Sequence, residues 1–453
     1  MAIRRILVAN RGEIAVRIAR AAAELGIESV AIYSEDDAPS PHHRAADQSY
    51  ALTGSGPAAY LDGAALVTAA QATGCDAVHP GYGFLAESAA FAEQVLAGGL
   101  TWIGPRPEVA ARLGNKTAAR DLAREVGVPT LQGTEGPATL EQARHFAETE
   151  GLPVMIKAVA GGGGRGMREV TALEGLEDAF NRASREAQAA FGDGSLYLER
   201  LVRRARHLEV QVLGDGVDVV HAWERDCTVQ RRHQKLVEIA PAPALDSATR
   251  ERLLGHALTL ARAVKLDSLS TIEFLLDRDA PVGRDIVFIE ANARLQVEHT
   301  VTEAVTGIDL VQAQIRLAAG ETLGAIGLTQ REIPPPRGFA IQSRVNAEAV
   351  QPDGSVRPAS GKLTRFEAPT GPGVRVDTVA EAGYGPNPRF DSLLAKIIVH
   401  STSPSFEAAA RKTARSLSEL RAEGIASNAP LLAAVAAHPV FAAADLTTRF
   451  LAD

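Results

Sequence analysis

Cysteine and long apolar runs are both scarce in this sequence. Its 453 residues include only two cysteines, Cys75 and Cys227, which lie far apart and without the spacing of metal ligands. A disulfide framework is therefore excluded, and a reducing compartment, the cytoplasm, is expected. No stretch reaches the roughly eighteen uncharged apolar residues that a membrane span requires, so we expect no membrane partner.

A surplus of positive charge is missing as well. The formal net charge is -8, from 47 basic and 55 acidic residues, so the totals do not favour a nucleic acid partner. Hydrophobic residues make up 46% of the chain and charged residues 23%, which is ordinary for a protein with a well-formed core. The length predicts roughly two to four domains.

The order of apolar and polar segments predicts an α/β and α+β protein in three parts. From residue 1 to 115, short apolar strands alternate with alanine-rich helical stretches, which indicates a doubly wound parallel sheet. Residues 116–330 contain hairpin-like strand pairs and helices, typical of an α+β unit. The run IPPPRG at 333–338 cannot continue a helix or a central strand, so we expect a linker. Residues 331–453 then form a strand-rich part that ends in a helix near 405–422.

Two carboxylates lie within otherwise apolar strands, Glu273 in TIEFLLD and Glu290 in IVFIEAN. Burial of such charges without compensation is costly, so a cation is expected between them. The residues that join the two segments are rich in Asp, Pro and Gly, which predicts a hairpin with both carboxylates on one face. With Asn292 the site has oxygen ligands suited to Mg²⁺ (or Mn²⁺), which substrate phosphates usually complete. The alternative is that both carboxylates pair with arginines in the core.

A glycine-rich run is the second candidate feature. The sequence GGGGRGM matches a GxGxxG pattern, which by itself is weak support for a nucleotide site. A dinucleotide site needs a helix directly after the glycines, whereas the residues from Met167 onward resemble a return strand. We therefore interpret the run as a flap whose amides close over phosphates, with a loose hairpin turn as the alternative. The glycines are Gly161, Gly162, Gly163, Gly164 and Gly166.

Residues on either side of the glycines are candidates for contact with a nucleotide. Lys157 ends the apolar strand before them, and Lys116 is a second cation that could meet phosphate oxygens. Taken alone, either lysine is more often a solvated surface residue. The segment YLERLV, with Glu199 and Val202, offers backbone groups and apolar surface to an adenine, although an ordinary strand exit explains it as well.

Two further segments carry polar residues in a regular pattern. Strict alternation in HLEVQVL places His207, Glu209 and Gln211 on one face, which we expect to line something polar. The run QRRHQK lies between apolar strands, so an anion such as phosphate or bicarbonate is expected there rather than a solvated face. Its candidate residues are Gln230, His233 and Lys235.

The segment RLQVEH directly follows the second acidic strand. Arg294, Gln296 and Glu298 can therefore stand on one side, close to the expected metal. The guanidinium of an arginine holds a planar oxyanion through two hydrogen bonds, and a neighbouring carboxylate can accept a proton from it. The segment predicts a site that activates a small carboxy-type acid.

Taken together, these residues resemble the biotin carboxylases of the ATP-grasp superfamily. The runs ANRGEIAVRIARAAAELGI, HPGYGFLAES, GGGGRGM, ERDCTVQRRHQK and EANARLQVEHTVTE follow the family's signature runs in order, over residues 3 to 452. The resemblance implies an N-terminal biotin carboxylase domain at 1–115 and an ATP-grasp domain at 116–330 with a mobile lid at about 130–203. It implies a C-terminal biotin carboxylase domain at 331–453.

The resemblance also implies a reaction and a role for each residue. MgATP phosphorylates bicarbonate to carboxyphosphate, and biotin on a carrier is then carboxylated. Glu298 is the implied base, and Arg344 the arginine that stabilises the biotin enolate beside Tyr82. The implied ATP contacts are Lys116, Lys157, the glycines at 161–166, Glu199, Val202, His207, Gln230 and His233. The implied metal ligands are Glu273, Glu290 and Asn292, and the implied bicarbonate contacts are Lys235, Arg294, Gln296 and the backbone of Val297.

Biotin and the remaining activities are expected on partners. The three methionines do not form the MKM tripeptide that carries biotin, so the resemblance implies a biotin carboxyl carrier and a carboxyltransferase as separate proteins or domains. Thr300 stands where acetyl-CoA carboxylase subunits have proline, and resembles the pyruvate and long acyl-CoA branches. Pro372 replaces an aromatic residue of the usual dimer face, so a homodimer is possible rather than assured.

Two rival functions remain at this point. Another ATP-grasp enzyme, a carboxylate-amine ligase or a carbamoyl-phosphate-type synthetase, shares the acyl phosphate step, but the QRRHQK run and Arg344 argue against it. A nucleotide-sensing module with a decayed site predicts ATP binding without turnover. Every matched position carries the expected residue type, which argues against decay.

Overall fold

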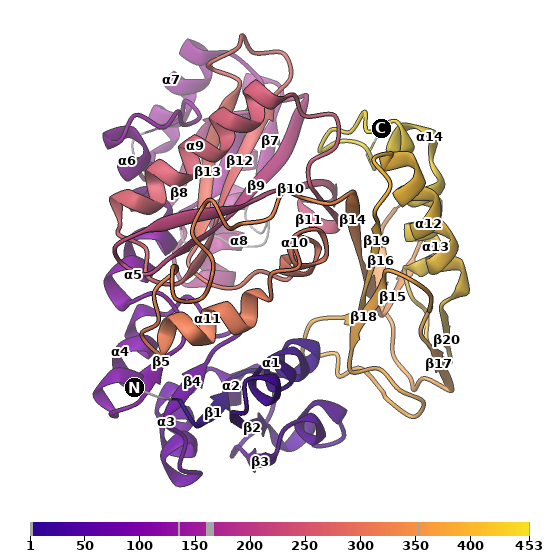
Figure 1. The fold of residues 1–453 in the computed structure, drawn as a ribbon. Coiled ribbons are helices and arrows are strands. Elements are labelled where there is room, and N and C mark those ends of the chain that lie inside the picture. Colours follow the sequence, from indigo (N-terminus) through magenta and orange to yellow (C-terminus); the bar gives the residue numbers. More distant parts are fainter. Residues whose placement is uncertain (1–2, 135, 160–166, 352–353, 453) are drawn as a thin grey trace.

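The computed structural model describes residues 3–134, 136–159, 167–351 and 354–452. They form an N-terminal parallel sheet, a large antiparallel sheet with a small sheet beside it, and a helix-covered C-terminal part (Figure 1). The expected combination of α/β and α+β architecture is confirmed. Within these residues, no helix has both the length and the apolar character needed to cross a membrane.

The N-terminal sheet is parallel, with the strand order β3-β2-β1-β4-β5. Ile6 and Val8 of β1 point into one apolar cluster and Leu7 points into another, so both faces of the sheet are covered, as a parallel sheet requires. Its strands are β1 (Arg5–Val8), β2 (Glu28–Tyr33), β3 (Gln48–Ala51), β4 (Ala77–His79) and β5 (Thr101–Trp102). Its helices are α1 (Gly12–Glu24), η1 (Glu35–Asp37), η2 (Pro41–Ala45), α2 (Pro57–Tyr60), α3 (Gly63–Ala72), α4 (Ala89–Ala97) and α5 (Pro107–Gly114).

The large sheet is antiparallel and has eight strands in the order β13-β12-β9-β10-β11-β14-β19-β18. It joins the middle and C-terminal parts of the chain, because β11 pairs directly with β14 and Ile239 lies opposite Ile341. The strands are β9 (Ala205–Gly214), β10 (Val219–Arg231), β11 (Gln234–Ala240), β12 (Leu269–Asp277), β13 (Ile286–Asn292), β14 (Phe339–Asn346), β18 (Val374–Thr378) and β19 (Leu393–Ser401).

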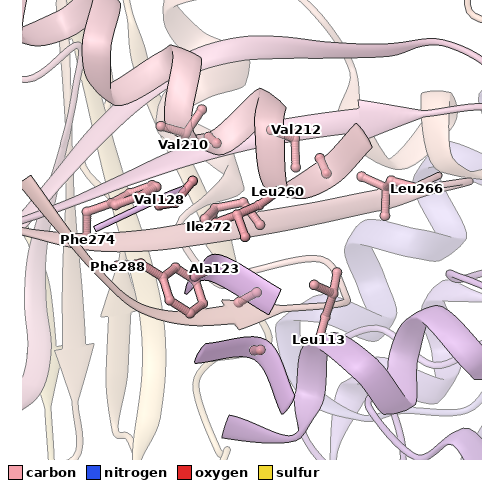
Figure 2. Close-up of a cluster of buried hydrophobic side chains, with 14 of the residues drawn as sticks. Leu113, Ala123, Val128, Val210, Val212, Leu260, Leu266, Ile272, Phe274 and Phe288 are labelled. Atoms are coloured by element: carbon pink, nitrogen blue, oxygen red, sulfur yellow. The ribbon is translucent and has the colours of Figure 1, made fainter. Parts of the chain in front are cut away.

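One face of this sheet is the apolar core shown in Figure 2. Val210, Ile272 and Phe288 from three neighbouring strands meet helices α5, α6 (Lys116–Glu125) and α9 (Ser247–Ala263), which contribute residues such as Ala123 and Leu260. Alternate residues of a strand point to opposite faces, so filling one face with these side chains leaves the polar residues of β9 and β12 on the other. In β13 a register shift leaves Ile289 as an extra residue, so Glu290 joins that polar face although Phe288 lies in the core. That polar face is where the candidate site lies.

The two hairpins predicted from the sequence are both present. β12 and β13 pair antiparallel with Glu273 opposite Glu290, and β6 and β7 pair on either side of the glycine-rich run with Ile156 opposite Arg168. The second hairpin belongs to a three-stranded sheet of order β7-β6-β8. The elements of this part are α7 (Leu140–Glu150), β6 (Val154–Ala158), β7 (Arg168–Val170), η3 (Leu173–Gly175), α8 (Leu176–Phe191) and β8 (Leu196–Arg200).

The C-terminal helices cover the end of the large sheet, where they appear in yellow in Figure 1. The helix expected near 405–422 is confirmed as α12 (Phe406–Glu419), which begins at the N-cap Ser405 and buries Phe406 and Leu417. The remaining helices are α10 (His299–Thr306), α11 (Leu310–Ala318), α13 (Ala429–Ala437) and α14 (Pro439–Ala442). The short strands β15 (Glu348–Val350) and β16 (Val356–Pro358) form one two-stranded sheet, and β17 (Arg365–Glu367) and β20 (Arg421–Glu423) form another.

Candidate active site

One cavity of about 1090 Å³ brings all three parts of the chain together. Tyr82 reaches it from the N-terminal part, Lys157 from the small sheet and Arg344 from the C-terminal part. The other predicted residues in its wall are Lys116, Glu199, Val202, His207, Gln230, His233, Lys235, Glu273, Glu290, Asn292, Arg294, Gln296 and Val297. Glu298 lies directly behind the wall and is fully buried. The five predicted glycines lie outside the described residues.

The paired carboxylates of the β12–β13 hairpin differ in their surroundings. Glu290 is open to the cavity and its Oε2 lies 3.3 Å from Lys116 Nζ. Glu273 is buried, and His207 Nε2 lies 2.5 Å from its Oε2. Among the described residues neither carboxylate forms an ion pair with an arginine, so the alternative of a core arginine pair is wrong. The cations are instead a lysine beside each carboxylate.

Lys235 is the common partner of three buried carboxylates. Its Nζ donates to Glu209 Oε2 at 2.6 Å, to Glu273 Oε1 at 3.0 Å and to Glu298 Oε1 at 2.7 Å. Burial opposes a charged ammonium, but the surrounding carboxylates, led by Glu209, raise the pKa of Lys235 well above its ordinary value. Lys235 is therefore a permanent positive charge at the centre of the cavity.

Glu298 is held from two sides. Lys235 contacts one oxygen, and Arg344 Nη2 donates to the other, Oε2, at 3.0 Å. Burial disfavours the charge, but these two cations, with Arg225 behind them, hold the pKa of Glu298 far below its ordinary value. Arg344 also donates from Nε to Glu238 Oε1 at 2.5 Å. Glu298 is consequently ionised, which is the state a proton acceptor needs.

The polar face predicted for HLEVQVL is only partly exposed to the cavity. His207 lies in its wall, 2.6 Å from Gln230 Nε2 through its Nδ1. Glu209 and Gln211 are fully buried instead and hold the guanidinium of Arg225, which donates to Gln211 Oε1 at 2.9 Å. The face therefore meets polar groups as expected, but only His207 reaches the cavity, because alternation fixes the face of a residue and not what packs against it.

A cationic cluster lies at the end of the cavity near the small sheet. Lys157 Nζ lies 2.5 Å from Glu199 Oε2, and Arg120 Nη1 lies 3.0 Å from the other oxygen. Burial would lower the pKa of Lys157, but Glu199 raises it above the ordinary value. With Lys116, the cluster has more positive than negative charge and faces the cavity, so it suits an anion such as a phosphate chain.

The segment after β13 adds a second group of donors. Arg294 Nη2 donates to Asn292 Oδ1 at 3.0 Å, and its Nε lies 3.3 Å from Glu87 Oε1. Gln296 Nε2 donates to Glu273 Oε1 at 2.9 Å. Gln296 and Lys235 therefore share the carboxylate of Glu273, and Arg294 is linked to it through Asn292, whose Nδ2 donates to Glu273 Oε1 at 2.7 Å. The predicted oxyanion contacts thus lie in one group.

The donors around the hairpin fit a hard divalent cation. Glu273 and Glu290 lie directly opposite each other in the register, both reach the cavity, and Asn292 adds an amide oxygen on the same strand. All are oxygen donors, the type that Mg²⁺ and Mn²⁺ prefer. A cation there would replace the contact of Asn292 Oδ1 with Arg294 and compensate the two carboxylates.

The sequence and the structure of this chain are both similar to known proteins. The N-terminal and C-terminal domains of biotin carboxylase match residues 2–110 and 342–453, and the ATP-binding domain of the carbamoyl-phosphate synthase L chain matches 115–326. The biotin carboxylase domain of 2-oxoglutarate carboxylase from Hydrogenobacter thermophilus is 40% identical and has a TM-score of 0.94, over 100% of this chain and 98% of that one.

The chain belongs to the biotin carboxylase family.

Other biotin carboxylases agree with this assignment. The biotin carboxylase of Campylobacter jejuni is 38% identical, with a TM-score of 0.94 over 100% of this chain and 99% of that one. Pyruvate carboxylase 1 of Caenorhabditis elegans is 48% identical over 99% of this chain. The chain spans only 38% of the length of that relative. The Hydrogenobacter domain was determined as a dimer with MgADP, ADP and bicarbonate. The expected family is confirmed.

Several residues of this biotin carboxylase site were not found by the motif analysis. Arg225 neutralises the carboxylates from behind, and Glu238 does the same for Arg344. Glu13 lines the cavity beside Tyr82, and Lys396 lies behind Val297. Lys396 could have been recognised from the sequence, because a lysine within the apolar run LLAKIIVHS is the same kind of anomaly that identified Glu273. Glu13 could not, because a single acidic residue near the start of a helix is ordinary.

Proposed function

We propose that the chain carries out the first half-reaction of a biotin-dependent carboxylase. In this reaction MgATP phosphorylates bicarbonate, which gives carboxyphosphate and ADP, and the carboxyl group then passes to biotin on a carrier with release of phosphate. One observation supports it most: Lys116 pairs with Glu290, Glu290 lies opposite Glu273 in the sheet register, and ion pairs continue from Glu273 to Lys235, Glu298 and Arg344. The groups for phosphate, for a small oxyanion and for biotin therefore lie in reach of one another.

At the nucleotide end, Lys116 and Lys157 would bind the phosphate chain, with His207, Gln230 and His233 nearby. Glu273, Glu290 and Asn292 would hold Mg²⁺ or Mn²⁺, which neutralises phosphate charge during phosphoryl transfer. Such transfer depends mainly on positioning and charge neutralisation, which these residues supply. Glu199 and Val202 would contact the adenine end, and the glycines at 161–166 would cover the phosphates.

At the centre, Arg294, Gln296, Lys235 and the backbone of Val297 would hold bicarbonate, and Glu298 would take its proton. In this structure Lys235 and Arg344 compete with a proton for both oxygens of Glu298. A carboxylate with so low a pKa is a weak base. Glu298 can act only when bicarbonate takes over part of the hydrogen bonding of these two cations, which ties proton transfer to the presence of the substrate.

At the far end, Arg344 and Tyr82 would face biotin. The ureido nitrogen of biotin is a poor nucleophile, and loss of its proton leaves negative charge on the ureido oxygen. The Arg344 guanidinium, positively charged in every state of the site, stabilises that charge. The hydroxyl of Tyr82 is bound to Glu13, so its ring rather than its hydroxyl is available to biotin.

The direct test is ADP release by the purified chain with free biotin. We expect turnover that requires MgATP, bicarbonate and biotin together, with carboxybiotin detected from labelled bicarbonate. ADP release that depends on an amine acceptor and not on biotin would instead identify a carboxylate-amine ligase or a carbamoyl-phosphate-type synthetase. Nucleotide binding without any turnover would identify a sensing module.

We further propose that the biotin carrier and the carboxyltransferase are separate proteins or domains, and that the chain can form a homodimer. Multi-domain carboxylases among the relatives, and a dimeric domain from Hydrogenobacter thermophilus, support this. A cytoplasmic location stays a prediction from the two unpaired cysteines, Cys75 and Cys227. Mixing the chain with a biotinylated carrier domain and measuring a lower KM than for free biotin would test the first partner.

A further inference from the structure

Lys396 of β19 is an unusual residue for its position. Its side chain is fully buried, which a lysine tolerates only with close partners. Its Nζ lies 3.0 Å from Glu13 Oε2 and 3.7 Å from Asp377 Oδ2, and donates to the backbone carbonyl of Val297 at 3.2 Å. One ammonium thus ties β18, the first helix and the turn before α10 together.

The sheet register places Lys396 beside Arg344. Arg344 on β14, Lys396 on β19 and Asp377 on β18 lie opposite one another in one row, so their side chains share a face of the sheet. Arg344 holds the side chain of Glu298, and Lys396 holds the carbonyl of the residue before it. Arg344 and Lys396, which are neighbours in this row, therefore hold Glu298 and Val297, which are consecutive residues of the turn before α10.

Lys396 reaches the opposite wall of the cavity as well. Glu13, its acidic partner on α1, accepts a hydrogen bond from the hydroxyl of Tyr82 through its other oxygen. Tyr82, Glu13 and Val297 all line the cavity, whereas Lys396 itself is absent from the described residues of its wall. The ammonium thus lies behind the wall, between the candidate biotin side and the candidate bicarbonate side.

We propose that Lys396 is a positioning residue that fixes the Val297 backbone for bicarbonate and, through Glu13, fixes Tyr82 on the biotin side. The inference rests on the proposed function, since bicarbonate and biotin are the ligands of these two walls. Asp377 does not need the ammonium for its own neutrality, because Arg375 donates to both of its oxygens at 2.8 and 2.7 Å. Asp377 therefore keeps a cationic partner without Lys396, whereas Lys396 is the ion-pair partner of Glu13 among the described residues and the donor to the Val297 carbonyl.

The first test is Lys396→Met in the intact chain, after the unmodified chain has shown bicarbonate- and biotin-dependent ADP release. We expect the KM for bicarbonate to rise about tenfold or more, as for other residues that orient a contact group from behind. The Kd for MgADP should stay within about twofold, because the nucleotide end shares no partner with Lys396. An unchanged bicarbonate KM in an active enzyme would overturn the proposal. An inactive unmodified chain would instead count against the proposed function.

A second variant separates positioning from simple charge compensation. Glu13→Gln combined with Lys396→Met buries no unpaired charge, and the amide oxygen still accepts from Tyr82. Lys396→Met alone leaves Glu13 without its cation and should lower the Tm, whereas this double variant should have the Tm of the unmodified chain. Its bicarbonate KM should stay raised, because the Val297 carbonyl still has no donor. Return of both Tm and KM to their original values would show that Lys396 is merely structural.

Lys412→Met is the matched control. Lys412 lies on α12 in the same part of the chain and also donates to backbone carbonyls, including that of His400 at 2.7 Å, but its partners His400 and Pro372 do not line the cavity. Its loss should leave the KM for bicarbonate unchanged. A comparable rise in KM for this variant would attribute the Lys396 effect to general loosening of the C-terminal part and overturn the proposal.

Discussion

Three buried carboxylates share one ammonium at the centre of the cavity. Glu209, Glu273 and Glu298 each contact Lys235, and Arg225 and Arg344 supply the remaining positive charge. Removing one member of a buried ion pair is costly chiefly when its partner is left alone. In this network each group has a second partner, so single neutral substitutions should disturb chemistry more than folding.

Glu298→Gln tests this at the residue that we propose as the base. Lys235 keeps two carboxylates and Arg344 keeps Glu238, so the fold should persist. Bicarbonate-dependent ADP release should be abolished, while the Kd for MgATP should change by less than about tenfold, or roughly 1.4 kcal/mol. Titration calorimetry and the ADP assay measure both.

Glu251→Gln, an exposed substitution on α9, is the control for this variant and should leave both values unchanged. Parallel loss of turnover and of MgATP affinity in Glu298→Gln would argue that the residue supports the nucleotide site and is not the base.

His79 gives a prediction about pH. Burial, followed by the charge of Arg17, lowers the pKa of His79 to about 3, and its Nδ1 accepts the N–H of Gly81 at 3.0 Å. As the pH falls below about 6.5, the usual pKa of histidine, His79 therefore becomes protonated in the unfolded chain before it does so in the folded chain. The contribution of His79 to the free energy of unfolding should therefore fall by about 1.4 kcal/mol for each pH unit below about 6.5.

Denaturant unfolding at several pH values above and below that point measures the effect. His79→Asn keeps an acceptor for the Gly81 N–H and cannot titrate, so the variant should lose stability less steeply on acidification. Identical pH slopes for the variant and the unmodified chain would contradict the assignment of that loss to His79.

At the scale of an element, helix α7 next to the small sheet has a complete capping box. The Thr139 hydroxyl accepts from the N–H of Gln142 at 3.2 Å, and the Gln142 side chain accepts from the N–H of Thr139 at 2.8 Å. Thr139→Ala should destabilise this helix by about 1 kcal/mol. Faster amide hydrogen exchange confined to Leu140–Glu150 would be the signature.

Thr68→Ala on α3 serves as the comparison, because the Thr68 hydroxyl donates to a carbonyl inside its own helix and caps nothing. That substitution should not accelerate exchange. Unchanged exchange in α7 of the Thr139 variant would show that packing, rather than the cap, holds the start of the helix.

At the scale of the molecule, the large sheet makes the middle and C-terminal parts one folding unit. Val237 and Ile239 of β11 share a buried cluster with Ile341 and Ile397 from β14 and β19. A cut between the predicted domains would expose this cluster and an unpaired strand edge. Residues 332–453 expressed alone should therefore lack a cooperative thermal transition, and the intact chain should melt these two parts together.

Calorimetry of the fragment and of the intact chain measures this. A second fragment, in which residues 232–240 are linked to 332–453, is the matched control because β11 pairs with the strand edge again, and it should gain structure. A sharp transition in the plain fragment at the temperature of the intact chain would contradict a shared folding unit.

Much of the site was predictable because its signals are local. A carboxylate in an apolar strand, as at Glu273, is anomalous whatever the fold, and a hairpin connection predicts that its strand pairs with the strand of Glu290. The register shift that brings Glu290 onto the same face had no such signal. The glycine-flanking hairpin and α12 followed from strand and helix periodicity in the same way. These inferences need only neighbours in the chain.

The sequence by itself determined the elements, the family and the types of charge that must be buried. Only the tertiary structure decided which groups compensate these charges. It places Arg225 next to Glu209, where we expected the cavity, and it places Lys235 among three carboxylates. It also places Lys396 between Glu13 and Val297. The physical reason is that periodicity constrains residues a few positions apart, whereas compensation of a buried charge is set by whichever side chains the fold brings within a few ångströms. In the pair of Lys396 and Glu13 they come from a strand and a helix more than a hundred residues apart.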